Sequence, residues 1–312
     1  MSNYPNIKVI STGHYVPEKI LSNHDLEQIV STTNEWIVSR TGIKNRRIAE
    51  GENTSDLAVK AAKDAILSSN YDTSKIDLII VATFTPDYKS PSVASLVQAK
   101  LGLNNQEITA FDLNAACTGF IYALNVASRM LESKAFKSAL VIGAEVISKV
   151  TDYTDRNTCV LFGDGAGAVL LELTNEYKPA MFYTASKGDL DKILYVDEFV
   201  HMDGQKVYQF ASKAIEKSIL KLLEFDKSSF DKIDTIIPHQ ANLRIIQSAS
   251  KSLKIPMENF FLNIELYGNT SAASCAIALD EYVKSSVDTE NQAVLLVAFG
   301  AGLTWGGARL TL

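Results

Sequence analysis

The chain has 312 residues, of which 46% are hydrophobic and 21% are charged, and its formal net charge is −6. These values are ordinary for a soluble globular protein with a sizeable core, and the acidic balance argues against a dedicated nucleic-acid-binding protein. No secretory signal is visible, and no apolar run is long enough to span a membrane. Together with the acidic balance, this leads us to expect neither nucleic acid nor membrane among the partners. The cysteines are odd in number and widely spaced, which argues against a disulfide framework and predicts a cytoplasmic protein. Without Cys-x-x-Cys or His-x-x-x-His pairs, a structural zinc is not expected.

Short β-branched runs alternate with alanine-rich helical patterns, which is typical of an α/β protein. The first predicted helix spans 35–40 and is capped by Thr32. The second spans 56–67 and is begun by Thr54 or Ser55. Several apolar runs carry no polar face, which is expected of central strands covered by helices on both sides. The predicted strands span 76–83, 108–113, 139–144, 235–239 and 293–299.

The sequence partly repeats itself at a shift of about half its length. The segment 75–80, Lys-Ile-Asp-Leu-Ile-Ile, reappears as Lys-Ile-Asp-Thr-Ile-Ile at 232–237, a shift of 157 residues (234 − 77). Weaker echoes join two further pairs of segments, 138–143 with 292–297 and 162–167 with 305–308. The repeat predicts two similar halves, 1–174 and 175–312, and a pseudo-twofold axis would bring equivalent strand ends together.

One cysteine lies where a predicted strand passes into a helix. The segment 110–119, Ala-Phe-Asp-Leu-Asn-Ala-Ala-Cys-Thr-Gly, contains this junction. At a helix N-terminus, unpaired N–H groups and the helix dipole favour a thiolate, and small neighbours let a substrate carbonyl approach. Cys117 is therefore a candidate nucleophile, although a buried core cysteine fits the same pattern. Cys159 and Cys275 lie inside apolar patterns and are assigned to the core.

Polar blocks in the second half occupy similar places. His239 ends a predicted strand, where α/β proteins place their chemistry, and it begins the run His-Gln-Ala-Asn-Leu-Arg. Asn269 stands in Gly-Asn-Thr-Ser directly before a helix, where a simple turn or capping residue would also fit. A third strand ends in the run Phe-Gly-Ala-Gly-Leu at 299–303, whose N–H groups are candidates for an oxyanion hole.

The blocks around Cys117, His239 and Asn269 resemble those of the β-ketoacyl-[acyl-carrier-protein] synthase III family of the thiolase superfamily. The segments 34–43 and 155–168 resemble that family as well, and the resemblance runs in order from about residue 13 to residue 309. It implies a duplicated five-layer α/β/α/β/α fold and a homodimer. It also implies an acyltransferase that initiates fatty acid synthesis. Acyl-CoA acylates the cysteine, and decarboxylative condensation with malonyl-acyl carrier protein then gives 3-oxoacyl-acyl carrier protein, CoA and CO₂.

The resemblance also implies roles for individual residues. His239 Nε2 and Asn269 Nδ2 bind the malonyl thioester carbonyl and stabilise the enolate, while the N–H groups of Cys117 and Ala301 form the second oxyanion hole. The implied CoA contacts are Trp36, Arg40, Arg156 and Asn242. The implied carrier-protein contacts are Gln240, Ala241, Asn242, Leu243 and Arg244. No metal is implied, and no cofactor beyond the acyl-CoA and acyl-carrier-protein substrates.

Several of these features have simpler interpretations. Trp36 fits a core position of its helix, and the glycines of 163–167 fit tight packing better than a phosphate loop, because an apolar strand follows them. Lys213, Lys217 and Lys221 form a stripe at helical spacing, which fits a solvated face or a docking surface for an acidic carrier protein.

Two departures from the family pattern affect the expected substrate. Ser90 stands where many acetyl-specific relatives carry a phenylalanine that reaches the partner's acyl pocket, and the segment 187–200 is shorter than usual. We therefore expect a starter other than acetyl-CoA. The alternatives are a related acyltransferase of secondary metabolism with a non-acetyl starter, a Cys-His-Asn hydrolase, and an acyl- or CoA-binding module. A thiolase would need a second cysteine in 299–306, and we find no glutamate block like that of hydroxymethylglutaryl-CoA synthase.

Overall fold

The computed structural model describes residues 4–226, 230–285 and 288–312. The helices are α1 (Asn23–Glu27), α2 (Asn34–Thr41), α3 (Thr54–Ser69), α4 (Val93–Lys100), α5 (Gly119–Glu132), α6 (Arg156–Cys159), α7 (Gly204–Asp226), α8 (Leu243–Leu253), α9 (Ile264–Tyr267) and α10 (Ser274–Ser285). The strands are β1 (Ile7–Tyr15), β2 (Ile20–Ser22), β3 (Asn45–Arg47), β4 (Leu78–Ala82), β5 (Thr109–Leu113), β6 (Ser138–Glu145), β7 (Gly165–Leu173), β8 (Met181–Ser186), β9 (Leu194–Val196), β10 (Val200–Met202), β11 (Thr235–Pro238), β12 (Ala293–Gly300) and β13 (Thr304–Thr311).

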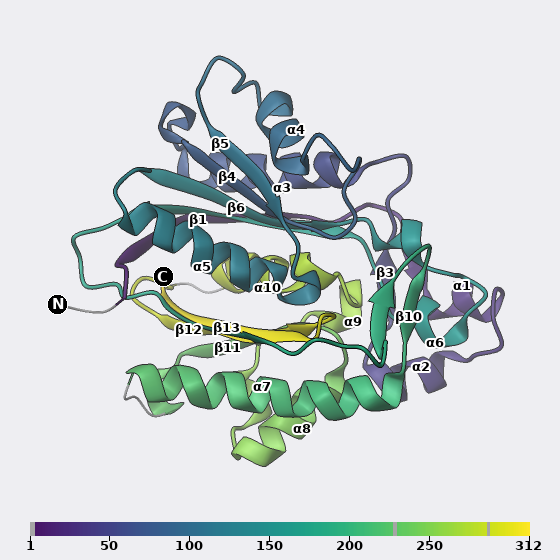
Figure 1. The fold of residues 1–312 in the computed structure, drawn as a ribbon. Helices are drawn as coiled ribbons and strands as arrows, with labels where there is room; N and C mark the ends of the chain where they lie inside the picture. The colour runs from purple at the N-terminus through teal and green to yellow at the C-terminus, as the bar shows by residue number, and fades with distance from the viewer. Residues whose placement is uncertain (1–3, 227–229, 286–287) are drawn as a thin grey trace.

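The elements stack in five layers (Figure 1). Helices α3 and α4 cover the outer face of the first sheet, α5 and α10 lie between the two sheets, and α7 and α8 cover the outer face of the second. The first sheet has the order β1-β7-β6-β4-β5 and the second has the order β11-β12-β13-β8. The predicted α/β/α/β/α fold is therefore confirmed.

The central strands are buried because helices cover both of their faces. Every residue of β4, β6 and β12 is buried, as the lack of a polar face predicted. β4 runs parallel to β5 and β6, and β11 runs parallel to β12. All five predicted strands form, with ends that differ by at most two residues from the expected ones. The parallel strands therefore end together, and their carboxyl ends are available for a site.

Two expected helix starts are wrong by one residue or more. Helix α3 has Asn53 as its N-cap, and its Thr54 and Ser55 hydroxyls donate instead to the Thr85 carbonyl and the Asp87 carboxylate. In α2 the N-cap is Thr33 rather than Thr32, because the Thr33 hydroxyl accepts the Trp36 N–H at 3.2 Å. In α3, tertiary partners compete with capping for the hydroxyl groups.

The two halves of the chain supply one sheet each. The strands of the first sheet all lie within residues 7–173 and those of the second within 181–311. The two halves pack closely against each other in the middle layer, where a Cβ placed on Gly167 of β7 would lie 2.5 Å from the Ala276 Cβ of α10. This contact confirms tight packing for the glycine run. The division at residue 174 falls in the connection between β7 and β8 and stays a prediction.

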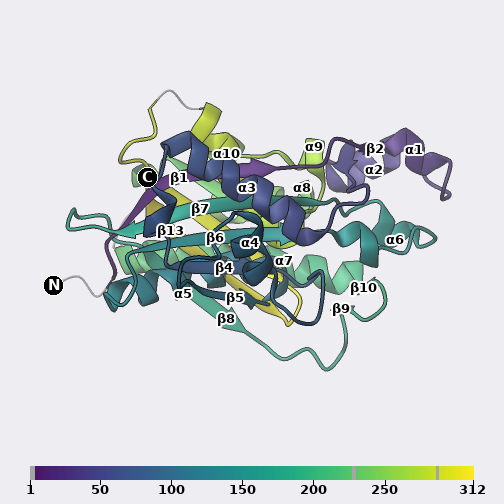
Figure 2. The same ribbon diagram turned by 90° about the horizontal axis from the view of Figure 1, so that it is seen from above.

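Short elements gather at one end of the molecule, opposite both termini. Figures 1 and 2 place α1, α2, α6 and the β9–β10 hairpin together at this end. The carboxyl ends of β5 and β12 point toward it, so the short elements enclose the space beyond the strand ends. Among the described helices, none combines the length and apolar character that a membrane span requires.

Candidate active site

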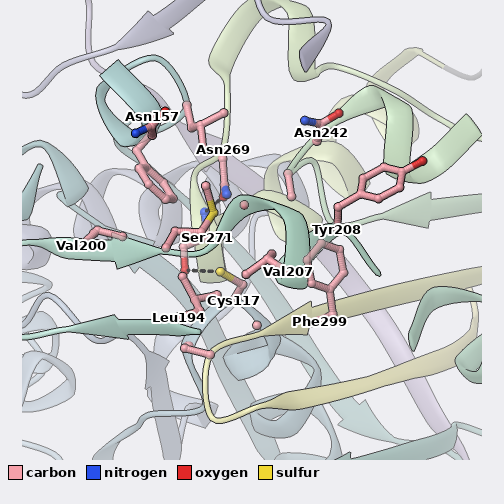
Figure 3. Close-up of a pocket in the computed structure, with 18 of the residues that line it drawn as sticks. Cys117, Asn157, Leu194, Val200, Val207, Tyr208, Asn242, Asn269, Ser271 and Phe299 are labelled. Atoms are coloured by element: carbon pink, nitrogen blue, oxygen red, sulfur yellow. Dashed lines mark hydrogen bonds between the residues drawn. The ribbon is translucent and has the colours of Figure 1, made fainter. Parts of the chain in front are cut away.

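A cavity of about 1030 Å³ opens beyond the strand ends. Cys117 and Phe84 line it from the first half, and His239, Asn269 and Ala301 line it from the second. The structure thus brings the predicted nucleophile and both predicted partners to one cavity, and Figure 3 shows Cys117 beside Asn269 and Ser271. The cavity also has apolar walls, which are formed by Leu194 of β9, Val200 of β10 and Val207 of α7.

Cys117 lies in a 3₁₀ turn between β5 and α5. The preceding residue, Ala116, has a left-handed backbone with φ of 48°, an unusual conformation for a residue with a side chain. The Cys117 thiol accepts a hydrogen bond from the Ser271 hydroxyl at 3.2 Å. Burial nevertheless raises the pKa of the Cys117 thiol to about 12, so the resting nucleophile is a thiol. Desolvation raises this pKa more than the Ser271 hydroxyl lowers it, so the thiolate that the helix end was expected to favour is not the resting form.

His239 is a neutral imidazole with two free ring nitrogens. The residue is 1% exposed, its N–H donates to the Val297 carbonyl at 2.7 Å, and its ring packs against Phe299 with centroids 5.3 Å apart. Burial lowers the His239 pKa to about 3. Neither ring nitrogen has a hydrogen-bond partner within the described part of the chain. A buried imidazole that is unpaired and lines a cavity is arranged to bond a ligand.

The Asn269 side chain is oriented by its neighbours. Its backbone N–H donates to the Leu161 carbonyl and its carbonyl accepts the Gly163 N–H, which ties this loop to the first half of the chain. The Asn269 Oδ1 accepts the Ser271 N–H at 2.9 Å. Because the oxygen is engaged there, the amide nitrogen is the group left for the cavity.

The turn after β12 approaches the nucleophile closely. A Cβ placed on Gly300 would lie only 2.8 Å from the Cys117 backbone nitrogen, so this position requires glycine. Ala301 follows and lines the cavity, half-buried. The Thr304 and Thr118 hydroxyls lie 3.0 Å apart, which fastens the two turns to each other.

Three of the expected CoA residues, Trp36, Arg40 and Asn242, line the cavity, whereas Arg156 does not line it and lies against the Trp36 ring. The Arg156 guanidinium stands 4.9 Å from the centroid of the Trp36 ring, a cation–π pair, and the half-buried ring also packs against a core cluster that includes Ile37, as the simpler interpretation expected. Arg156 also donates to the Ser31 carbonyl at 3.2 Å. Arg40 is exposed and lines the cavity, as does Asn242, which caps α8 through the Arg244 N–H.

The expected carrier-protein residues divide into a buried and an accessible group. Gln240 is 1% exposed, and its amide group bonds the backbone of Pro238, Phe261, Asn263 and Ile264. Its side chain therefore braces the His239 loop and does not reach a partner, contrary to the expectation. Arg244 is exposed and lines the cavity, so its side chain is accessible to a partner. Leu243 is half-buried and packs against Gly42, where it would be the first contact of an added Cβ.

Ser90 is exposed and is not among the residues that line this chain's own cavity. The expectation placed it at the pocket of a partner subunit, and it stays a prediction. The lysine stripe lies on α7, where Lys213 and Lys217 are exposed and Lys221 pairs with Glu224 at 2.5 Å.

Sequence reasoning missed two residues of the site. Ser271 stands two positions after Asn269, and its block was noticed without a role being given to the serine. Phe84 follows the end of β4, and the rule that strand ends carry function would have found it.

The short segment after β8 forms the β9–β10 hairpin, in which Tyr195 stacks on His201 at 4.7 Å.

Comparisons with known proteins agree with this geometry. The family model described as 3-Oxoacyl-[acyl-carrier-protein (ACP)] synthase III matches residues 111–189, and the model of its C-terminal part matches residues 223–312. A protein of Acholeplasma laidlawii named beta-ketoacyl-[acyl-carrier-protein] synthase III is 50% identical over the whole of both chains. A Clostridium acetobutylicum protein of the same name is 47% identical over 96% of this chain and 97% of its own. The crystal structure of 3-oxoacyl-[acyl-carrier-protein] synthase III from Aquifex aeolicus is 43% identical, with a TM-score of 0.95 over 98% of this chain and 100% of its own.

Proposed function

The chain belongs to the 3-oxoacyl-[acyl-carrier-protein] synthase III family, and on that premise we propose that Cys117, His239 and Asn269 perform its reaction. The activity is that of a β-ketoacyl-[acyl-carrier-protein] synthase III, an acyltransferase-type condensing enzyme of fatty acid biosynthesis. One observation carries the residue assignment: a cysteine from one half and a neutral, unpaired histidine from the other line the same cavity. The secondary-metabolism alternative is not favoured by relatives of 47% to 50% identity.

In the first half-reaction the Cys117 sulfur attacks the thioester carbonyl of acyl-CoA. The new carbon–sulfur bond replaces the bond to CoA, and the thiol proton leaves with the CoA thiolate. The backbone N–H groups of Cys117 and Ala301 hold the oxyanion that forms in between. The Ser271 hydroxyl, which donates to the sulfur at 3.2 Å, supports the thiolate as the proton departs.

In the second half-reaction malonyl-acyl carrier protein loses CO₂, and its thioester carbonyl becomes an enolate oxygen. The N–H groups of His239 Nε2 and Asn269 Nδ2 stabilise that oxygen. Both donors are neutral, since burial holds the His239 pKa at about 3, so their bonds strengthen as charge develops in the transition state. The enolate carbon then attacks the acyl carbonyl, a carbon–carbon bond forms, and the bond to the Cys117 sulfur breaks to release 3-oxoacyl-acyl carrier protein. The Cys117 thiolate takes up a proton from water and returns to the resting thiol.

The substrates' carriers are assigned to the cavity mouth. The Trp36–Arg156 pair presents an aromatic face and a cation to the CoA adenine, and Arg40 offers its charge to the CoA phosphates. Asn242 serves the pantetheine arm. Arg244 together with the exposed lysines of α7 gives an otherwise acidic chain a basic face for an acidic carrier protein.

A homodimer would join two copies through β5. This strand is at the edge of the first sheet and, among the described strands, pairs only with β4. Its free backbone groups offer a ladder to a second copy, and the Ser90 segment would then reach the partner's cavity. Sedimentation of wild type and an Ala110→Pro variant tests this arrangement, since a dimer through β5 predicts that proline shifts the protein toward monomer.

Intact-mass spectrometry after mixing with acetyl-, isobutyryl- and octanoyl-CoA tests the function and the starter together. We expect an acyl adduct on wild type that is absent from Cys117→Ala, and faster acylation by a starter other than acetyl-CoA. Addition of malonyl-acyl carrier protein should discharge the adduct as a 3-oxoacyl product. Hydrolysis without that product would support a hydrolase, and a clear acetyl preference would refute the starter assignment.

A further inference from the structure

A buried acid lies behind one wall of the cavity. Glu145 ends β6, is 0% exposed, and is not among the cavity-lining residues. The segment 83–85, which follows β4, lies against it and carries Phe84, whose side chain lines the cavity together with Cys117. Burial of a carboxyl group is unfavourable unless the surroundings supply hydrogen bonds, so the contacts of Glu145 reveal what it holds.

Within the described residues, every hydrogen-bond donor to the Glu145 side chain belongs to the segment 83–85. The Thr83 hydroxyl and the Thr85 N–H donate to Oε2 at 3.1 Å, and the Thr85 hydroxyl donates to it at 2.5 Å. The Phe84 N–H lies 3.2 Å from Oε1 and 3.3 Å from Oε2. No salt bridge of the described residues includes Glu145. The group therefore serves as a dedicated acceptor for three consecutive residues.

The same segment is fastened on its other sides. The Thr85 carbonyl accepts the Thr54 hydroxyl at 2.5 Å, and the Thr85 hydroxyl accepts the Val146 N–H at 3.0 Å. Glu145 thus holds the backbone N–H groups of Phe84 and Thr85, which fixes the backbone from which the aromatic ring extends to the cavity wall. A rigid wall beside an acyl thioester limits how long the acyl chain can be.

We propose that Glu145 is a positioning residue for starter selection, which clamps the segment 83–85 and so fixes Phe84 as a rigid wall of the acyl site. This inference rests on the proposed function, because it takes Cys117 as the acyl carrier. Glu145 acts only through Phe84, since its own side chain does not reach the cavity.

Asp280 provides a matched control. It is also 0% exposed and bonded, in this case to Thr12, His14 and Lys284, but it is not among the cavity-lining residues. Its loss should therefore lower stability without any change in starter selection. Glu145→Gln is the conservative control, because the amide oxygen can replace Oε2, which accepts from Thr83 and Thr85, without a change in side-chain size.

The experiment measures single-turnover acylation of Cys117 by octanoyl-CoA and acetyl-CoA, and takes the ratio of the two rates. Phe84→Ala should raise this ratio about tenfold, and Glu145→Ala should raise it several-fold in the same direction. The double variant should show no more than the Phe84→Ala effect, because Glu145 has nothing left to position. Glu145→Gln and Asp280→Asn should stay within about twofold of wild type.

Thr85→Val removes the donor of the 2.5 Å bond while keeping the side-chain shape, and it replaces Glu145→Ala if that protein does not fold. An unchanged ratio in the folded variant would overturn the proposal, and so would an effect that multiplies with that of Phe84→Ala. If wild type forms no acyl-cysteine with any starter, the proposed function itself is wrong. The two failures are thereby distinguished.

Discussion

The turn that carries Cys117 and the turn that carries Asn269 have the same backbone design. Ala116 and Ser271 both adopt a left-handed conformation, with φ of 48° and 49°. The Ala116 N–H donates to Asn114 Oδ1 at 3.1 Å, as the Ser271 N–H does to Asn269 Oδ1 at 2.9 Å. Each turn continues through a 3₁₀ segment into a helix of the middle layer, α5 or α10. The duplication seen in the sequence thus extends to the active-site turns.

Each half also makes room for the other half's turn. Gly143 of β6 and Gly300 of β12 occupy equivalent places, because each faces the active-site turn of the other half. A Cβ on Gly143 would lie 2.3 Å from the Ala272 carbonyl oxygen, and one on Gly300 would lie 2.8 Å from the Cys117 nitrogen. The pseudo-twofold relation therefore places both turns at the interface of the two sheets.

The turns differ in what their side chains present. Cys117 lines the cavity, whereas Ala272, its counterpart in the second turn, is 1% exposed and does not. Asn269 is buried beside the nucleophile, while its counterpart Asn114 is exposed. The two turns share one backbone conformation, and their different side chains fit the nucleophile proposed in the first turn and the amide donor proposed in the second.

The largest expected effect separates Cys117 from its counterpart. Cys117→Ala should lower acyl-enzyme formation at least about 10³-fold, because no other described cysteine lines the cavity. The combined Cys117→Ala, Ala272→Cys variant should not recover it, since position 272 is buried. Intact-mass analysis after addition of acyl-CoA measures both, and an adduct on residue 272 would break the comparison.

The two asparagines should differ next most strongly. Asn269→Ala should lower decarboxylation of malonyl-acyl carrier protein by about 10² to 10³, the usual effect of losing one donor to an enolate or oxyanion. Acylation of Cys117 should change little in this variant. Asn114 also lines the cavity but is exposed, and a donor that water solvates contributes less to the enolate, so Asn114→Ala should lower decarboxylation by less than about tenfold. Equal losses of CO₂ release would contradict the division of roles.

Alanine substitutions at Gly300 and Gly143 should affect different properties, the first the rate of acylation and the second the free energy of unfolding. Gly300→Ala should slow acylation by roughly tenfold to a hundredfold, because the added Cβ displaces the Cys117 backbone. Gly143→Ala should instead cost about 1–3 kcal/mol of unfolding free energy, since it overpacks against Ala272. Urea unfolding and single-turnover acylation measure the two outcomes. An acylation defect in Gly143→Ala as large as that in Gly300→Ala would show that the turns are not specialised.

The smallest expected effect concerns Ser271. Its hydroxyl lowers the Cys117 pKa, while burial raises it to about 12, so loss of the hydroxyl should raise this pKa further. Iodoacetamide reacts with the thiolate, whose fraction rises about tenfold per pH unit below the pKa. Ser271→Ala should therefore lower the alkylation rate about fivefold at every pH from roughly 7 to 9, the worth of about 1 kcal/mol. A rate equal to that of wild type would remove the serine from thiolate support.

Much of this site could be predicted because its signals are local. The strands that precede Cys117 and His239 are recognisable as apolar runs, and the two residues follow those strands by four residues (117 − 113) and by one (239 − 238). Two expectations failed because they left out burial. The Cys117 thiol was expected to ionise, yet desolvation raises its pKa, and Gln240 was expected to meet a partner, yet it is 1% exposed. Desolvation depends on segments distant in the chain, so no local pattern reveals it.

The sequence by itself determined the α/β rhythm, the duplication and the blocks that carry the nucleophile and its partners, because periodicity and turn chemistry are properties of neighbouring residues. Tertiary structure alone decided that Ser271 reaches the sulfur across 154 positions of chain (271 − 117), and that Glu145 holds the wall with Phe84. These contacts arise where two sheets pack against shared helices, and only the packing brings their atoms within hydrogen-bonding distance.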